Sequence, residues 1–225
     1  MRRLLTLAVL LGASMALAAP AAYDVFPETR SPDGRFAVAW GVPGKTIDSA
    51  RLRADGGDNE YADQVLNDAE KAQNYLIDLK KKSIVAPLSG FKGFFKENNG
   101  GVSARWSKKD PVALVTHHGK WEPRALSLIN TAGVQKPLLE KLRNDIRDYL
   151  RPKGGKKYAR VKEQLAFEVN DATFLPGKLT LTVTASVPKE EEGYSATVWA
   201  VYRFRARNGQ LRIVDSHILP QGAKK

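Results

Sequence analysis

Residues 178 to 187 read KLTLTVTASV, and this stretch decides the fold class. Leucine, valine and alanine occupy every second position from Leu179 to Val187, with Lys178, threonine and serine between them. Successive side chains of a β-strand point to opposite faces, so the alternation predicts a half-buried strand. Its inner face is apolar, and its outer face carries hydroxyl groups.

Further strands are expected on both sides of this stretch. Residues 165–169 alternate in the same way before it, and the runs 196–207 and 211–219 follow it around Asn208 and Gly209. Asn-Gly is a strong signal for a tight hairpin turn because both residues tolerate positive φ. The chain is therefore expected to end in at least three antiparallel strands.

One segment has helical periodicity instead. From Pro137 to Leu150, apolar side chains recur every three or four residues, which predicts a helix with one apolar face. Pro137 suits a first helical turn, and Pro152 followed by two glycines ends the pattern. The apolar positions are Leu138, Leu142, Ile146 and Tyr149 or Leu150.

The N-terminal half reads as a series of short hairpins. Residues 54–73 are polar and acidic, so we expect a loop there, with a short helix near 63–72. The predicted fold class is α+β: mainly antiparallel β-hairpins, one amphipathic helix at about 137–150, and a C-terminal antiparallel sheet. The expected N-terminal strands lie at 36–40, 74–79, 83–88, 102–106, 112–116 and 125–131.

This organisation divides the chain into three parts. They are an N-terminal leader at 1–18, a β-hairpin region at 19–133, and a helix with an antiparallel sheet at 134–225. A single domain that combines the last two parts is the alternative, because their joint length suits one large domain or two small ones.

Two turn sequences carry a partial family resemblance. The stretch from Ser31 to Val38, SPDGRFAV, resembles the turn-and-strand signature of β-propeller repeats like those of the bacterial TolB protein. The stretch from Trp106 to Leu114, WSKKDPVAL, looks like a degenerate second copy. The resemblance covers at most residues 31–133 and implies propeller-like hairpins, since a closed propeller needs at least four blades. The whole arrangement also looks like many exported bacterial proteins, a likeness that implies no site residues.

The first residues have the order of a secretory signal peptide. Two arginines precede the apolar run Leu4 to Leu11, and Ala16 and Ala18 supply the small side chains that signal peptidase requires. Cleavage is expected before Ala19, with a second possible site in the Ala-Pro-Ala sequence that begins there. A twin-arginine signal and an uncleaved anchor over residues 4–22 are the alternatives. The mature chain is expected to be periplasmic or secreted, without a transmembrane span.

Composition narrows the class of partner. The chain has no cysteine, so we expect neither disulfide bonds nor a lipid anchor on cysteine. The formal net charge is +12, and it falls to +10 without Arg2 and Arg3. A strongly basic protein attracts polyanions, which for an exported protein means anionic envelope polymers or acidic proteins rather than nucleic acid. A charge that serves only solubility is the alternative.

Two groups of basic residues are the candidate anion-binding residues. Strand geometry places Arg203, Arg205 and Arg207 on one face, where guanidinium groups bind phosphate or carboxylate in pairs of hydrogen bonds. The second group follows the predicted helix, in a segment with an excess of positive charge. It comprises Lys156, Lys157 and Arg160. An exposed face paired with the acidic run at 190–192 is the alternative.

Histidines suggest two catalytic or metal-binding pairs, and neither is convincing. His117 and His118 are adjacent, so in a strand they point to opposite faces and cannot chelate one metal together. Asp215 and His217 would share a face, as in an Asp-His pair that orients a base. However, the chain has no Gly-x-Ser-x-Gly nucleophile motif, so we predict no catalytic residue.

The remaining candidates have plainer explanations. An acidic cluster at residues 55–63 could hold Ca²⁺, but its spacing does not match a calcium loop, and a solvated loop is favoured. The tryptophans could stack on sugars, yet each lies in or beside a strand pattern, where burial is the default. The acidic cluster is Asp55, Asp58, Asn59, Glu60 and Asp63, and the tryptophans are Trp40, Trp106, Trp121 and Trp199.

From these features we expect a non-enzymatic exported protein that binds or interacts through a basic surface. The ligands would be anionic envelope components or acidic proteins, and no cofactor or metal is expected. A hydrolase that acts on a cell-envelope polymer is the alternative. The two differ in what they require: an enzyme needs a cleft with converging acid and base groups, and a binding module needs a continuous basic face.

Overall fold

The structure is a computed structural model that describes residues 22–57, 59–66, 72–92, 101–120, 122–153, 165–187 and 194–221. It contains three four-stranded antiparallel sheets, here called the first, middle and third sheets, and the predicted α+β, mainly antiparallel class is confirmed. The predicted signal peptide at 1–18 lies outside the described residues, so export stays a prediction.

The first sheet has the strand order β1-β2-β3-β4. Every residue of β2 is buried, because both faces of the sheet are covered with apolar side chains. Val38 and Trp40 belong to the core shared with the middle sheet, and Ala37 and Ala39 belong to a small cluster on the opposite face. The strands are β1 (Asp24–Val25), β2 (Phe36–Gly41), β3 (Gln73–Asp78) and β4 (Ser83–Leu88).

The middle sheet is buried on both faces. All positions of β6 and β7 are inaccessible, and alternate residues belong to two different cores. Leu114 and Leu128 pack toward the third sheet, and Val115 and Ile129 pack toward the first. The strands are β5 (Val102–Trp106), β6 (Val112–His117), β7 (Ala125–Asn130) and β8 (Gln135–Pro137).

The two turn sequences that resemble propeller repeats adopt the same closing hydrogen bond. The amide of Ser31 donates to the carbonyl of Phe36 at 2.8 Å, and that of Ser107 donates to the carbonyl of Val112 at 2.9 Å. Each serine Oγ also accepts a backbone amide of its own turn, from Phe36 at 2.8 Å and from Asp110 at 3.0 Å. The two turns share the closing bond but differ in the amide that the serine Oγ accepts, and the family resemblance itself stays a prediction.

Two short helices precede β3, and the second lies in the stretch 54–73 that the sequence predicted to be mostly loop. They are α1 (Ser49–Arg53) and α2 (Glu60–Leu66), and the 3₁₀ segment η2 (Ala54–Gly57) lies between them. A second 3₁₀ segment, η1 (Pro27–Thr29), precedes β2. The short helix predicted near 63–72 is found in part, since α2 begins three residues earlier, at Glu60, and residues 67–71 lie outside the described residues. Asp48 caps α1 by accepting the amides of Ala50 and Arg51 at 3.1 Å, and Asn59 Oδ1 accepts the amide of Ala62 at 2.9 Å. These are the side chains that favour helix starts.

The predicted amphipathic helix is α3 (Leu139–Leu150). Its buried residues Leu142, Ile146 and Leu150 recur every four residues, as a helix packed on one side requires. One detail was wrong: Pro137 ends β8 instead of starting the helix, and Leu138 is the N-terminal cap residue. The carbonyl of Leu126 accepts the amide of Leu138 at 2.8 Å, which ties the helix start to β7.

The third sheet is a simple meander with the order β12-β11-β10-β9. The predicted alternation in β10 is confirmed, because Leu179, Leu181, Val183 and Ala185 are fully buried. These side chains form one core with α3 and the middle sheet, so this face is called the inner face and the opposite one the outer face. The strands are β9 (Ala166–Leu175), β10 (Lys178–Val187), β11 (Tyr194–Arg207) and β12 (Gln210–Pro220).

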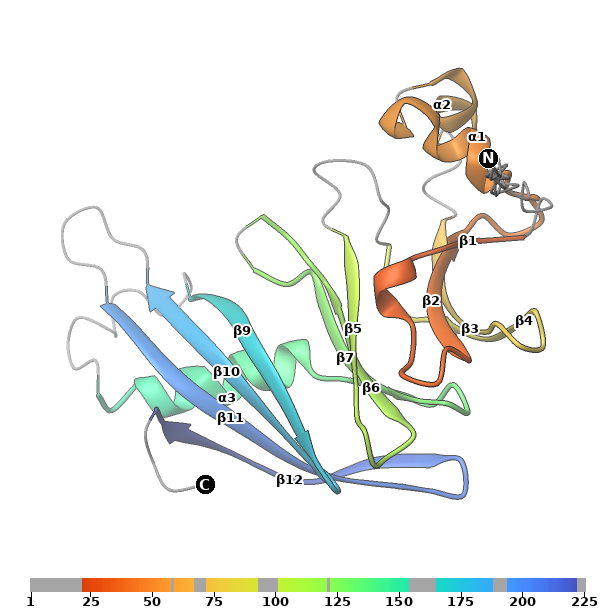
Figure 1. Cartoon of the computed structure of the whole chain (residues 1–225). Helices are drawn as coiled ribbons and strands as arrows, with labels where there is room; N and C mark the ends of the chain where they lie inside the picture. The colour runs from red at the N-terminus through yellow and green to blue at the C-terminus, as the bar shows by residue number, and fades with distance from the viewer. Residues whose placement is uncertain are drawn as a thin grey trace, which may run out of the picture.

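Figure 1 shows the resulting arrangement, with the middle sheet between the first sheet and the unit of α3 and the third sheet. The predicted boundary after residue 133 falls inside the middle sheet, because β7 and β8 pair across it. Among the described residues, no helix is long and apolar enough to cross a membrane.

Candidate functional site: a basic cluster on the third sheet

The β11–β12 hairpin forms as its Asn-Gly turn predicts. Asn208 and Gly209 both have positive φ, at 51° and 74°, which a two-residue hairpin turn of this type needs. The arginine row, Arg203, Arg205 and Arg207, is exposed, and the intervening Phe204 is only 3% exposed. The sequence-based placement of the three guanidinium groups on one face is therefore confirmed.

Cross-strand pairing adds two more cations to the arginine row. Lys178 in β10 lies opposite Arg203, and Arg212 in β12 lies opposite Arg205. We call these five residues, the arginine row with Lys178 and Arg212, the basic cluster. Like charges directly opposite each other destabilise a sheet, so this arrangement costs the protein stability. The Asn208-Gly209 turn sets the pairing of Arg205 with Arg212, and a β-bulge between Arg203 and Phe204 then places Asp215 opposite Arg203.

The basic cluster faces one carboxylate across the strands, Asp215, but forms no ion pair with a described residue. Among the described residues, no carboxylate lies within ion-pair distance of any of its five members. Asp215 lies opposite Arg203 on the neighbouring strand, but it pairs with His217, at 3.7 Å. An exposed group of cations without counterions attracts anions from solution.

The cations of α3 are different, because acidic side chains neutralise them. Lys141 pairs with Asp145 at 3.2 Å, and Arg143 pairs with Glu122 at 3.2 Å. Arg143 also lies over the ring of Phe167, 5.6 Å from its centre, so it serves packing as well as charge. The described part of the helix therefore adds little free positive charge, and Lys156, Lys157 and Arg160 lie outside the described residues.

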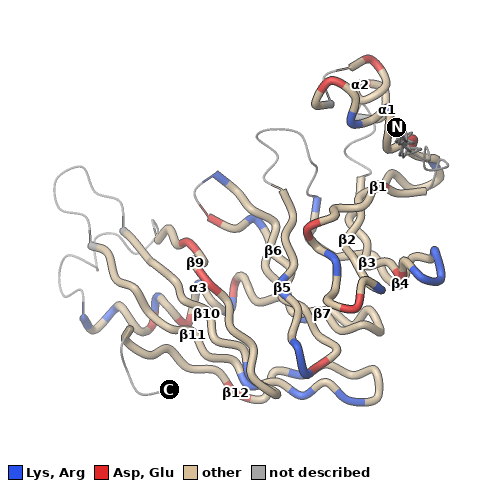
Figure 2. Tube along the Cα trace, in the orientation of Figure 1, with Lys and Arg blue, Asp and Glu red and all other residues tan. Residues whose placement is uncertain are grey.

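Hydrogen bonds to the middle sheet hold the basic cluster in place. The buried Asn130 donates from Nδ2 to the carbonyl of Gly209 at 2.9 Å, which fixes the hairpin tip. Asp110 accepts the amide of Gly177 at 3.1 Å, just before Lys178. In Figure 2, Lys and Arg gather along the β11–β12 hairpin and at the nearby β5–β6 turn, at the lower edge of the view.

Replacement of Asn130 by aspartate tests this anchoring. Oδ1 of Asn130 accepts the amides of Ala132 and Val134, at 3.1 and 2.9 Å, and aspartate keeps both acceptors. It loses the donor to Gly209 and sets a charge against that carbonyl, so we expect a loss of about 1–3 kcal/mol in unfolding free energy. Urea denaturation measures this loss. Unchanged stability, with unchanged amide exchange at the hairpin tip, would show that the bond is not needed.

A second candidate lies at the edge of the middle sheet. Ser103 Oγ and His118 Nε2 are 2.7 Å apart, a distance suited to a nucleophile and its base. Burial lowers the pKa of His118, which favours the neutral imidazole that a base requires. Sequence reasoning missed this pair, because it depends on which residues of β5 lie across from the end of β6.

The surroundings of this pair are less favourable to catalysis. A hollow of about 420 Å³ adjoins it, and Glu122 and Glu168 are the carboxylates that line this hollow. In the part of the chain that the structure describes, neither carboxylate hydrogen-bonds the other ring nitrogen of His118. The base thus lacks the third group that orients it in a triad. Adjacent residues of a strand point to opposite faces, and His117, on the other face from His118, is buried.

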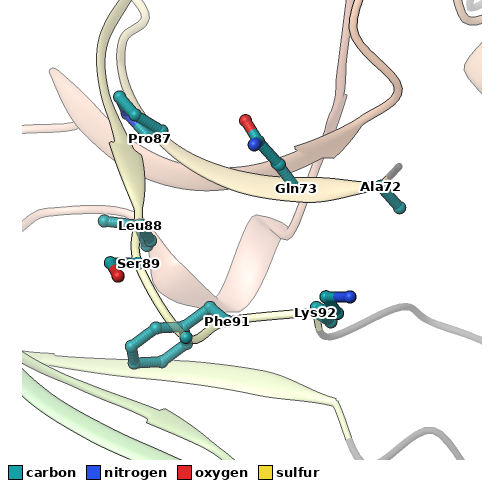
Figure 3. A pocket seen from close by; sticks show the side chains of 8 residues that line it. Ala72, Gln73, Pro87, Leu88, Ser89, Phe91 and Lys92 are labelled. Carbon is teal, nitrogen blue, oxygen red and sulfur yellow. The ribbon is translucent and has the colours of Figure 1, made fainter. Parts of the chain in front are cut away.

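A hollow of about 530 Å³ lies at the start of β3 and the end of β4 and is drawn in Figure 3. Leu88 and Phe91 are buried there, and Lys92 is the sole titratable side chain among its described lining residues. Gln135 holds the adjacent loop through Ser89, accepting its amide and donating to its carbonyl at 2.8 Å. With one cation and mainly apolar walls, this hollow offers no acid-base pair.

The acidic cluster proposed for Ca²⁺ belongs to the corner between α1 and α2. Asn59 uses its amide nitrogen to donate to the carbonyls of Arg51 and Ala54, at 3.0 and 2.8 Å, so it acts as a structural bridge. Asp58 lies outside the described residues. Within the described ranges, no group of three or more acidic or histidine side chains has the geometry of a metal site.

Of these candidates, the basic cluster combines exposure, uncompensated charge and a rigid support. The sequence matches no protein-family model and no curated protein sequence.

Proposed function

We propose that the protein binds anionic ligands through the basic cluster and is a non-enzymatic binding module of the cell envelope. Its ligands are anionic envelope polymers or acidic proteins. The observation that carries the proposal is the pairing of Lys178 with Arg203 and of Arg205 with Arg212, with no described carboxylate in ion-pair contact. An arrangement that is unfavourable alone is stabilised when an anion binds.

The export prediction determines which anions matter. A basic protein in the cytoplasm would meet nucleic acid first, whereas an exported one meets acidic polysaccharides, lipid head groups and other proteins. Arginine suits all these ligands, because its planar fork forms paired hydrogen bonds with carboxylate and phosphate.

The salt dependence of binding tests this proposal. We expect the affinity of the full chain for long-chain polyphosphate and for polygalacturonate to fall steadily between ~0.05 and ~0.5 M NaCl, because salt screens exposed charges. Fluorescence anisotropy with end-labelled polymers measures the affinity. Binding that is unchanged at ~0.5 M NaCl would contradict an electrostatic site.

A hydrolase that acts on an envelope polymer is the second proposal, and the Ser103–His118 contact is the observation that favours it. The two proposals predict different chemistry at Ser103. Covalent labelling of this serine by a fluorophosphonate, lost in His118→Ala, would favour the hydrolase. The absence of an orienting carboxylate among the described residues makes it the weaker proposal.

A further inference from the structure

The outer face of the third sheet continues beyond the basic cluster, and its composition changes there. Toward the other end of β11, the outer face carries Ser195, Thr197 and Trp199. Their neighbours in β10 are also hydroxyl-bearing, since Thr182 lies opposite Trp199 and Thr184 lies opposite Thr197. One surface thus has a cationic end and a hydroxyl-rich end with an indole in it.

The register fixes the orientation of Trp199. Its neighbours Val198 and Ala200 belong to the inner core and are at most 1% exposed, so Trp199 must point to the outer face. The indole is half-buried, which leaves part of it accessible. A partly exposed aromatic side chain on a polar sheet face can offer an apolar surface to a ligand.

The hydroxyl groups around this indole form a defined polar surface. Thr184 Oγ1 donates to Asn170 Oδ1 at 2.9 Å and lies 3.2 Å from Thr197 Oγ1. Such a surface can exchange hydrogen bonds with the hydroxyl groups of a sugar, while the indole packs against the apolar face of a sugar ring. These are the groups that a carbohydrate site combines.

The two ends of the face are separated in a way that favours a polymer. Four residues along a strand from Trp199 to Arg203 span about 13 Å. Val201 and Thr180 lie between them and are only 4% and 5% exposed, so a ligand that uses both ends must bridge them. Asp215 is on the same face opposite Arg203, so a ligand's anionic groups would favour Arg205, Arg207 and Arg212.

We propose that the anionic ligand is an acidic polysaccharide, bound along the outer face with its rings over Trp199 and its carboxylates at the basic cluster. This inference rests on the proposed anion-binding function. Single-stranded nucleic acid also has rings and charges, but its binding sites stack successive bases on several aromatic side chains. The described outer face instead presents one indole, which has Thr182 on one side and Leu219 on the other.

The test compares three polymers that are all negatively charged but differ in whether they contain sugar rings, bases or neither. Polygalacturonate has carboxylates and sugar rings, long-chain polyphosphate has charge without rings, and oligo(dT) has bases. We expect Trp199→Ala to weaken polygalacturonate binding about tenfold or more and to leave polyphosphate binding unchanged. Trp199→Phe should restore part of the lost polygalacturonate affinity. Because phenylalanine keeps an aromatic ring at this position, this variant also shows that the loss in Trp199→Ala is not a folding defect. Val214→Ala, at a residue that is 50% exposed on β12, is the control variant.

The outcomes separate the two levels of the proposal. Equal effects of Trp199→Ala on polygalacturonate and polyphosphate, or no effect on either, overturn the polysaccharide assignment while anion binding stands. Tighter, Trp199-dependent binding of oligo(dT) overturns it in favour of nucleic acid. Failure of all three polymers to bind the wild-type protein refutes anion binding itself.

Discussion

Glutamate at Arg203, Arg205 and Arg207 together is expected to lower the affinity for polygalacturonate and polyphosphate by about 100-fold or more at low salt. The three side chains are exposed on one face, and no described carboxylate neutralises them. Reversal therefore replaces an attractive surface by a repulsive one next to the polymer. Anisotropy titrations at ~0.05 M NaCl measure the loss, and the salt dependence of the remaining binding should become flatter.

A matched variant separates the local site from the net charge of the protein. Lys80, Lys81 and Lys82 form the exposed turn between β3 and β4, on the first sheet, and glutamate there changes the net charge by the same amount. We expect this control to lose only the small, general part of the attraction. If both triple variants lose equal affinity, binding depends on total charge and the basic cluster is not a site.

Alanine at Leu128 is expected to give the largest loss of stability, about 2–5 kcal/mol. Leu128 lies in the middle sheet, is fully buried and packs against the core of α3 and the third sheet. Its truncation leaves a cavity, and the packed layers on both sides cannot easily move to fill it. The same change at Leu175, which is 51% exposed at the end of β9, should cost less than about 0.5 kcal/mol.

Chemical denaturation of both leucine variants measures the difference. The slope of the unfolding free energy against denaturant concentration should stay constant if only stability changes. Similar losses at the two positions would mean that the middle sheet is less closely packed than its burial indicates.

Local patterns in the sequence predicted most of the secondary structure. The strict alternation in β10 and the helical spacing of Leu142, Ile146 and Leu150 reflect side-chain periods that burial imposes. The short helix predicted near residue 63 begins three residues earlier, at Glu60, and this difference shows the limit of such patterns. Its starting signal is the cap Asn59, a single residue in a polar stretch, just as Asp48 alone marks the start of α1.

The candidate site was predictable in part. Alternation alone placed the arginine row on one face, and the Asn208-Gly209 turn also implies that Arg212 lies opposite Arg205. The addition of Lys178 depends on the pairing of β10 with β11, which no local pattern specifies. The neutralisation of Arg143 by Glu122 likewise joins residues from separate elements, so only the folded chain reveals that the helix charges are compensated.

The position of the middle sheet has a consequence for how the chain can be divided. Its β6 and β7 strands carry one apolar face for each neighbouring layer, so neither half of the protein is complete without it. A fragment that ends near residue 133 would leave Leu114, Leu126 and Leu128 exposed to water as one continuous patch, the kind of surface that aggregates. Folding must therefore bring the strands on both sides of the middle sheet together before either core is complete.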